Sequence, residues 1–319
     1  MMKFAKLLLI LLLIGVMAFS VVGCGQEANT PEPPVNEDPV DNEPPADTLD
    51  PQEVAMEAAK TFFAAVADSN NIISSEDLKD MLDANPNSAL VIDIRSAEDF
   101  EAGHIEGAVH SPWGNVGEIM NRIPKNKPVI VACYSGQTAG QTVGLLRMAG
   151  FDNVKSLLSG MKLGWVGGAE FPTDGEGMNA AADLPEVTEP ATEEEQILWE
   201  KAQEVFADIA SGDRALIEPA ELKDALDGNP SSFYVLDIRR EEDFVEGHIE
   251  HSVHSAWAKA GDVLETLPTN RPVVVACYSG QTAGQTVGVL RLLGFDAKSL
   301  LYGVREGWVK RAELPLVTE

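Results

Sequence analysis

The strongest constraint on this chain is an internal repeat. The stretch ACYSGQTAGQTVG occurs at residues 132–144 and again, letter for letter, at residues 276–288. The match continues outside this stretch with the same offset, since Asp93 and Asp237 are also 144 residues apart. Such a period is far longer than the unit of a solenoid. The sequence therefore predicts a duplicated domain, in which one fold must satisfy both halves.

Each repeat alternates apolar runs of strand length with helical patterns. The runs are ALVIDIR and PVIVACY in repeat one, at 89–95 and 128–134, and FYVLDIR and PVVVACY in repeat two, at 233–239 and 272–278. Continuous β-branched runs are typical of parallel strands buried on both faces. A helix is expected to lead each repeat, at about 52–67 and 196–210. The predicted fold class is α/β, with two tandem domains that each hold a mostly parallel sheet flanked by helices.

The N-terminus has the pattern of an export signal. Two lysines precede an apolar run from Leu7 to Phe19, which is short for a membrane-spanning helix. The following Val-Val-Gly-Cys resembles a bacterial lipobox, which implies that residues 1–23 are a signal peptide and that Cys24 carries lipid. The alternative is a plain secretory signal. The lipobox favours a protein anchored to the bacterial cell membrane and facing outside the cytoplasm.

Two acidic, proline-containing stretches flank the first predicted domain. Residues 24–50 contain no lysine or arginine and are expected to form a disordered tether, and residues 172–194 are expected to form a linker. The domains then span 51–171 and 195–319. The formal net charge of −28, from 51 acidic and 23 basic residues, argues against nucleic acid or an anionic membrane surface as a partner.

Cysteine usage indicates two equivalent sites. The chain has three cysteines, and with Cys24 assigned to lipid, Cys133 and Cys277 remain at matching places of the two repeats. This arrangement favours two thiol sites over a disulfide framework. A bridge between Cys133 and Cys277 stays open, because the sequence does not say how the domains face each other.

Cys133 stands where a buried strand ends and a helix begins. Ligands bind at this edge of open α/β sheets, and loop N–H groups at the start of the helix can form an anion cradle that favours a thiolate. Gly136 permits unusual backbone angles, and Ser135, Gln137 and Thr138 are expected to add donors. The ordinary alternative is a buried core cysteine. The polar loop and its exact repetition favour a reactive thiol.

Taken together, the motifs of each repeat resemble those of the rhodanese domain, a sulfurtransferase family. The motifs are DIRSAEDFEAGHIEGAVH (93–110) and DIRREEDFVEGHIEHSVH (237–254), the two cysteine loops, and the closing elements LLSGMKLGW and LLYGVREGW. The resemblance covers about residues 70–170 and 214–311. Three motifs in the same order, found twice, make it specific.

The resemblance implies covalent sulfur transfer. Cys133 and Cys277 would attack the outer sulfur of a small donor (thiosulfate, polysulfide or a persulfide), and a thiophilic acceptor would remove it from the cysteine persulfide. The anion-binding loops would be Tyr134, Ser135, Gly136, Gln137, Thr138 and Ala139, and Tyr278, Ser279, Gly280, Gln281, Thr282 and Ala283. No cofactor or metal is expected.

The loops lack the arginine on which related phosphatases depend. The sixth residue after each cysteine is Ala139 or Ala283, and the first basic residue along the chain is Arg147 or Arg291. A phosphate dianion would have no bidentate partner, which argues against phosphatase activity. The absence of a loop cation also favours polysulfide or a persulfide over thiosulfate.

The other motif residues are interpreted as structural. They are Asp93, Arg95 and His104 in repeat one, and Asp237, Arg239 and His248 in repeat two. In the family that the repeats resemble, the arginine and its acidic neighbours mostly fix the fold. A loop that already forms the thiolate needs no histidine as general base.

The sequence predicts an extracytoplasmic, membrane-anchored sulfurtransferase. The alternative is a carrier module that holds sulfur, or a related anion, for a partner protein without turnover. A purely structural pair of domains is disfavoured, because both repeats keep the cysteine. The sequence identifies neither a protein partner nor the donor.

Overall fold

The computed structural model describes residues 49–175 and 180–318. The expected signal peptide, Cys24 and nearly all of the expected tether lie outside the described residues. None of the helices within them is both long enough and apolar enough to span a membrane.

Each repeat forms a five-stranded, wholly parallel sheet. The strands of repeat one are β1 (Ile72–Ile73), β2 (Leu90–Asp93), β3 (Val109–His110), β4 (Val129–Ala132) and β5 (Val154–Leu157), in the order β1-β5-β4-β2-β3. Those of repeat two are β6 (Leu216–Ile217), β7 (Tyr234–Asp237), β8 (Val253–His254), β9 (Val273–Ala276) and β10 (Ala297–Leu300), in the matching order β6-β10-β9-β7-β8. The predicted α/β class with two tandem parallel-sheet domains is confirmed.

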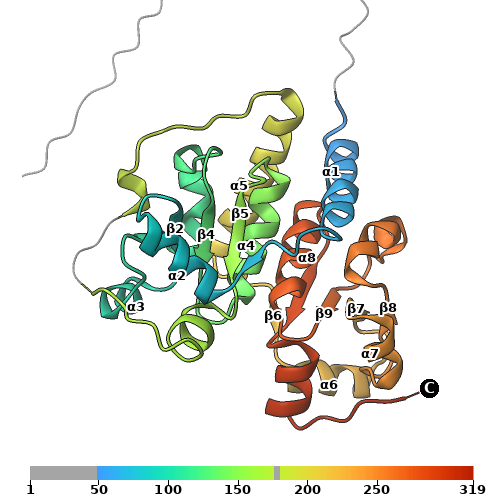
Figure 1. Ribbon diagram of the computed structural model, residues 1–319. Coiled ribbons are helices and arrows are strands. Elements are labelled where there is room, and N and C mark those ends of the chain that lie inside the picture. Colours follow the sequence, from blue (N-terminus) through green and yellow to red (C-terminus); the bar gives the residue numbers. More distant parts are fainter. Residues whose placement is uncertain (1–48, 176–179, 319) are drawn as a thin grey trace, which may run out of the picture. The chain divides into compact units, whose positions relative to one another are not determined.

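Helices cover the sheets in matching positions (Figure 1). In repeat one they are α2 (Ser75–Ala84), α3 (Ala97–Ala102), the 3₁₀ helix η1 (Trp113–Arg122), α4 (Gln137–Met148) and the π-helix η2 (Gly160–Trp165). In repeat two they are α6 (Pro219–Gly228), α7 (Glu241–Glu246), η4 (Trp257–Thr266), α8 (Gln281–Leu292) and η5 (Gly303–Arg311). A short 3₁₀ turn, η3 (Ala181–Asp183), lies in the expected linker.

The alternation of side chains along the central strands separates two cores. In β4, Ile130 packs in a cluster that belongs to repeat one alone. Its neighbour Val131 points to the opposite face and joins a larger cluster that also contains Val275 of repeat two. Successive residues of a strand face opposite sides, so one buried strand supplies both cores. The two repeats therefore share a hydrophobic core on the face that carries α4 and α8.

The helices α4 and α8 meet at very close range between the two sheets (Figure 1). A Cβ added at Gly140 or Gly284 would lie 2.3 Å from the backbone oxygen of Gln281 or Gln137 on the opposite helix. Gly144 and Gly288 make the same approach one turn later. Glycine within a helix costs about 1 kcal/mol relative to alanine, so these positions need a packing reason. The contact between the helices supplies that reason, and it explains why the repeated stretch extends past the cysteine loop.

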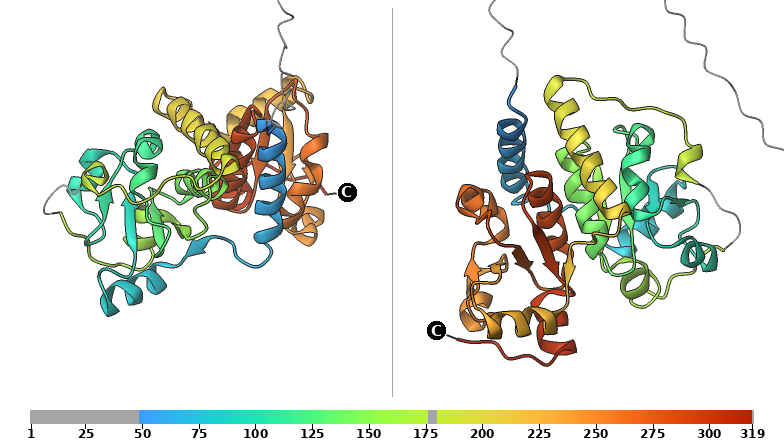
Figure 2. Two further views of the ribbon diagram at one scale, coloured as in Figure 1. Left: turned by 90° about the horizontal axis from the view of Figure 1, so that it is seen from above. Right: turned by 180° about the vertical axis from the view of Figure 1, so that it is seen from behind.

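The leading helix of each repeat packs on the other repeat. Helix α1 (Pro51–Ala65) lies against η4, where Lys60 forms an ion pair with Glu265 at 2.7 Å. Helix α5 (Glu193–Ala210) lies against η1, where Phe206 packs on Gly117. Figure 2 shows α1 in blue beside the orange helices of repeat two, and α5 in yellow beside the green helices of repeat one. The domain boundaries 51–171 and 195–319 stay a prediction. The structure adds that the first helix of each repeat packs against the other repeat.

Candidate functional site

Each cysteine sulfur lies at the base of its loop and accepts two backbone hydrogen bonds. Cys133 Sγ is 3.1 Å from the nitrogen of Gly136 and 3.3 Å from that of Ala139. Cys277 Sγ repeats this geometry at 3.1 Å and 3.4 Å, with the matching residues Gly280 and Ala283. Both cysteines are free thiols, only 1% and 2% exposed. Two N–H groups directed at one sulfur favour negative charge on that sulfur.

A left-handed glycine gives each loop its shape. Gly136 precedes α4 with φ of 88°, and Gly280 precedes α8 with φ of 94°. L-residues with a side chain rarely adopt this conformation. The turn directs the glycine N–H back to the sulfur and starts the helix directly after it. Of the loop amides that the sequence predicts as an anion cradle, two point to the sulfur in each repeat, and the role of the whole loop stays a prediction.

The closing elements, Gly160–Trp165 and Gly303–Arg311, support the two loops from behind. The carbonyl oxygen of Cys133 accepts from Met161 N–H at 2.7 Å, and that of Cys277 accepts from Val304 N–H at 2.7 Å. Gly160 lies so close that an added Cβ would be 2.4 Å from Cys133 O. The loop and the turn before the π-helix therefore form one packed unit.

Gln137 and Gln281 are not part of the open loop surface. Their side chains were expected to add donors around the sulfur, but they are 1% and 3% exposed and cross into the opposite repeat. Gln137 Nε2 donates to Ser299 Oγ at 2.6 Å, and Gln281 Nε2 donates to Ser156 Oγ at 2.8 Å. The expectation for these side chains is wrong, because the sequence could not show that each loop faces the other repeat. Ser135 and Thr138 remain half-buried.

The comparisons with known proteins agree with this geometry. A family model described as "Rhodanese-like domain" matches residues 74–166 and 218–311, which together exceed half of the chain. The chain belongs to the rhodanese-like domain family. The predicted resemblance is confirmed for both repeats.

Relatives with sulfur chemistry in their names match single rhodanese-like domains. The thiosulfate sulfurtransferase GlpE of Pseudomonas fluorescens is 39% identical over 75 residues, which cover 24% of this chain and 69% of that protein. YrkF of Bacillus subtilis, named as a candidate sulfur carrier protein, is 32% identical over 98 residues, which cover 31% of this chain and about half (52%) of that protein. The solved structure of SseA from Escherichia coli, a 3-mercaptopyruvate sulfotransferase, is 19% identical and aligns with a TM-score of 0.35, over 72% of this chain and 97% of that chain.

The Asp–Arg pair of each rhodanese-like domain is buried and bidentate. Arg95 donates to both carboxylate oxygens of Asp93, with the shortest contact at 2.6 Å, and also to the carbonyl of Gly103 at 2.8 Å. Asp237 and Arg239 repeat the pair in the second domain. These bonds tie the end of β2 or β7 to the segment after the short helix. Through Nε and Nη2, each arginine holds the aspartate carboxylate and one backbone carbonyl.

The histidines of the two Gly-His-Ile segments are held by backbone carbonyls. His104 Nδ1 donates to Phe100 O at 2.8 Å, and its ring stacks on the Phe100 ring with centroids 3.8 Å apart. His248 makes the same bond to Phe244 O at 3.0 Å. The partners of these imidazoles are therefore main-chain groups, as expected of structural residues. Across residues 49–175 and 180–318, no group of three His, Cys, Asp or Glu side chains is arranged to hold a metal ion.

A hydrogen-bonded tyrosine follows each cysteine. The Tyr134 hydroxyl donates to Asp99 at 2.6 Å and accepts from the Ser96 N–H at 3.1 Å. Hydrogen bonds from Ser96 and Tyr134 hold the pKa of Asp99 below its usual value. In the second domain Tyr278 bonds to Asp243, and Arg240 replaces Ser96 and adds an ion pair at 2.9 Å. The tyrosine links the cysteine loop to α3 or α7.

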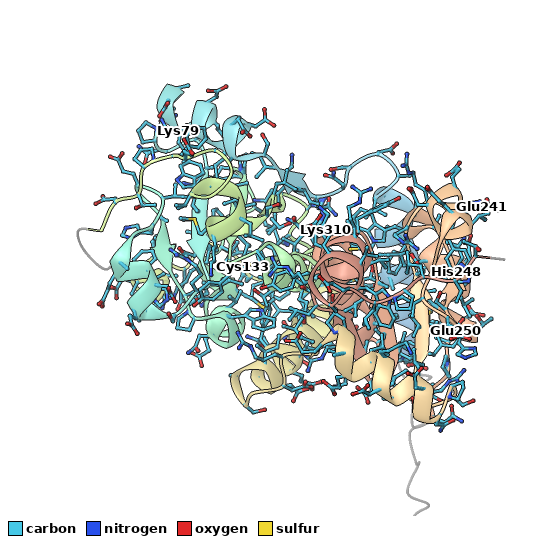
Figure 3. The ribbon with its side chains drawn as sticks, turned by 90° about the horizontal axis from the view of Figure 1, so that it is seen from below. Lys79, Cys133, Glu241, His248, Glu250 and Lys310 are labelled. Carbon is cyan, nitrogen blue, oxygen red and sulfur yellow. The ribbon has the colours of Figure 1, made fainter. Side chains whose placement is uncertain are left out.

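Basic side chains that are distant in sequence lie beside the second loop. A cavity of about 420 Å³ is lined by Tyr278, Arg305 and Lys310, among others. The Arg305 guanidinium lies over the Tyr278 ring, 5.3 Å from its centroid. Figure 3 labels Lys310 on η5 and Cys133 in the interior of the first domain. Sequence reasoning missed these cations because it counted only along the loop, although Arg305 follows the closing glycine by two residues.

Proposed function

We propose that this protein is a sulfurtransferase that carries sulfane sulfur on Cys133 and Cys277. The observation that carries the proposal is the pair of N–H groups on each sulfur, repeated in both domains. Membership of the rhodanese-like family and the names of its relatives support sulfur transfer as the class of chemistry.

The proposed reaction has two balanced steps. The cysteine thiolate attacks the terminal sulfur of a small donor, so that a new S–S bond forms while the donor S–S bond breaks and sulfite or a thiolate leaves with the electron pair. A thiolate acceptor then attacks the outer sulfur of the cysteine persulfide and releases the cysteine thiolate. The loop N–H groups stabilise negative charge at this position in both steps.

The enclosure of the thiols favours small donors. Because Cys133 and Cys277 are only 1% and 2% exposed, a compact sulfur anion fits the loop better than a bulky one. We further propose that the protein acts outside the cytoplasm and is anchored through lipid on Cys24. That part of the proposal rests on the lipobox-like sequence alone.

A second candidate function is a sulfur carrier for a protein partner. The deep burial of both thiols favours it, because a persulfide formed there would be shielded from stray acceptors. In this case the protein would load sulfur but release it only in the presence of its partner.

The test is a panel of sulfane donors given to the purified full-length protein, followed by intact mass measurement. We expect a gain of up to two sulfur atoms that cyanide removes. Catalytic release to small thiols identifies the transferase, whereas stable loading without release identifies the carrier. If no donor in the panel adds sulfur, the proposal is wrong.

A further inference from the structure

We propose that Gln137 and Gln281 are positioning residues that act across the domain boundary, each holding the cysteine loop of the other domain. Both are the first residue of the helix after their own loop. The backbone of each glutamine belongs to the cysteine loop of its own domain. Its side chain reaches into the other domain, next to the other cysteine loop.

The carboxamide of Gln281 is fully used by the first domain. Its Nε2 donates to Ser156 Oγ at 2.8 Å and to Leu157 O at 3.0 Å, and its Oε1 accepts from Ser159 N–H at 3.2 Å. Gln137 makes the same three bonds in the second domain, to Ser299 Oγ, Leu300 O and Tyr302 N–H. A carboxamide that bonds both to the end of a strand and to the turn after it fixes that turn relative to the sheet.

The turn that Gln281 holds has a strained backbone. Ser159 has φ of 56°, a left-handed conformation that is unfavourable for a residue with a side chain. Tyr302, which Gln137 holds, has φ of 59°. Such residues persist only where surrounding contacts enforce them. In each domain one of those contacts comes from the glutamine of the other domain.

The strained turn leads directly to the cysteine loop. Gly160 follows Ser159 and packs on the backbone of the loop, and Met161 N–H donates to Cys133 O at 2.7 Å. The Gln281 carboxamide also touches the loop itself, since a Cβ added at Gly136 would be 2.6 Å from Gln281 Oε1. Gly136 supplies one of the two N–H groups on Cys133 Sγ. Gln281 therefore supports the first cradle both through the turn and by direct contact.

The inference rests on the proposed sulfur chemistry for one of two readouts only. The first readout is amide hydrogen exchange of residues 134–140 and 278–284 in the full-length protein. The second is the rate of sulfur loading at each cysteine, which is followed on separate peptides that differ in mass because residue 145 is Leu and residue 289 is Val. Exchange does not depend on any sulfur donor.

We expect a crossed pattern. Gln281→Ala should speed exchange in 134–140 and slow loading at Cys133, each by about tenfold, with a change of threefold or less in the other domain. Gln137→Ala should have the same two effects on residues 278–284 and Cys277, and leave the first domain within threefold. Gln281→Met keeps the volume of the side chain without its hydrogen bonds and should give the same pattern if the alanine variant folds poorly.

The matched control is Gln285→Ala. Gln285 lies one turn further along α8, is fully buried, and also crosses the interface, where it bonds to Asn70 O and to Asn71 Nδ2. It does not contact the Ser159 turn, so its loss should loosen the interface without slowing Cys133. The proposal is overturned if Gln281 variants affect their own loop as much as the opposite one, or if Gln285→Ala gives the same pattern. Absence of loading in the parent protein, with the crossed exchange pattern intact, would reject the sulfur chemistry alone.

Discussion

The two cysteine sites share the same base, which is the repeated stretch at 132–144 and 276–288, but differ in their rims, which are the closing elements at 160–165 and 303–308. Thirteen identical residues place Cys133 and Cys277 under equivalent N–H groups, with distances that agree within 0.1 Å. The rims come from the closing elements, where Lys162 and the exposed Leu163 of the first domain are replaced by Arg305 and Glu306. Under the proposed function, the shared base would set the chemistry common to both sites, and the rim would select the donor at each site.

Removal of the sulfur itself is the strongest test of the shared base. Cys133→Ser and Cys277→Ser should each remove one of the two sulfur equivalents, and the double variant should load none, because serine forms no persulfide. Intact mass after treatment with a sulfane donor measures this. Complete loss of loading in either single variant would show that the two bases are not equivalent.

The glycines between α4 and α8 provide a test of the shared interface. Gly140→Ala and Gly284→Ala should each lower the free energy of unfolding by about 1–3 kcal/mol, because the new methyl group would overlap the facing backbone oxygen at 2.3 Å. Chemical denaturation measures the change.

Gly228→Ala is the control for these two variants. Gly228 ends α6, and an added Cβ there would have no neighbour within 4 Å. Its replacement should be neutral or raise stability by up to about 1 kcal/mol. If Gly140→Ala were equally harmless, the close packing of the two helices would be contradicted.

Each rim carries a cation at the matching position, Lys162 or Arg305, which predicts sensitivity to anionic donors. Arg305→Ala should slow loading of Cys277 by thiosulfate about two- to fivefold, because an exposed cation contributes less than about 1 kcal/mol to attraction of an anion. The effect should shrink at high salt, and the rate at Cys133 should stay within twofold. Equal rates at Cys277 with and without the arginine, at low salt, would remove the rim from the explanation.

The tyrosine anchors predict the smallest effect, visible in the pH dependence. The pKa of Asp99 is lowered by its hydrogen bonds to Ser96 and Tyr134, so this carboxylate stabilises the fold above its ordinary pKa of 3.8. That contribution is lost as pH falls through the lowered value. Tyr134→Phe should therefore reduce stability slightly at pH 7, and the difference from the parent should shrink in acid, where only the bond from the Ser96 N–H is left to lose.

The matching change in the second domain sharpens this test. The pKa of Asp243 is lowered most by Tyr278 and less by Arg240, whereas the pKa of Asp99 is lowered most by Ser96 and less by Tyr134. Thermal unfolding between pH 2 and 7 should therefore show a larger loss for Tyr278→Phe than for Tyr134→Phe. A smaller loss would mean that Arg240, and not Tyr278, is the main support of the Asp243 carboxylate.

The fold class, the duplication and the position of both thiols could be predicted from the amino-acid sequence. Buried parallel strands such as 89–95 and 128–134 carry their signal in consecutive β-branched residues, and the loop chemistry lies within seven residues of each cysteine. These signals lie in residues that are neighbours in the chain. Local patterns were therefore enough to predict them.

The contacts between the two repeats could not be predicted in this way and are seen in the folded chain alone. The packing of α1 and α5 on the opposite repeats, the contact of Gly140 with the opposite helix, and the bond of Gln281 to Ser159 all join residues more than seventy positions apart. Glutamine can bond to solvent, to its own loop or to another domain, and its sequence neighbours do not distinguish these partners. The same holds for Arg305, whose side chain reaches the second site only because the π-helix folds back over Tyr278.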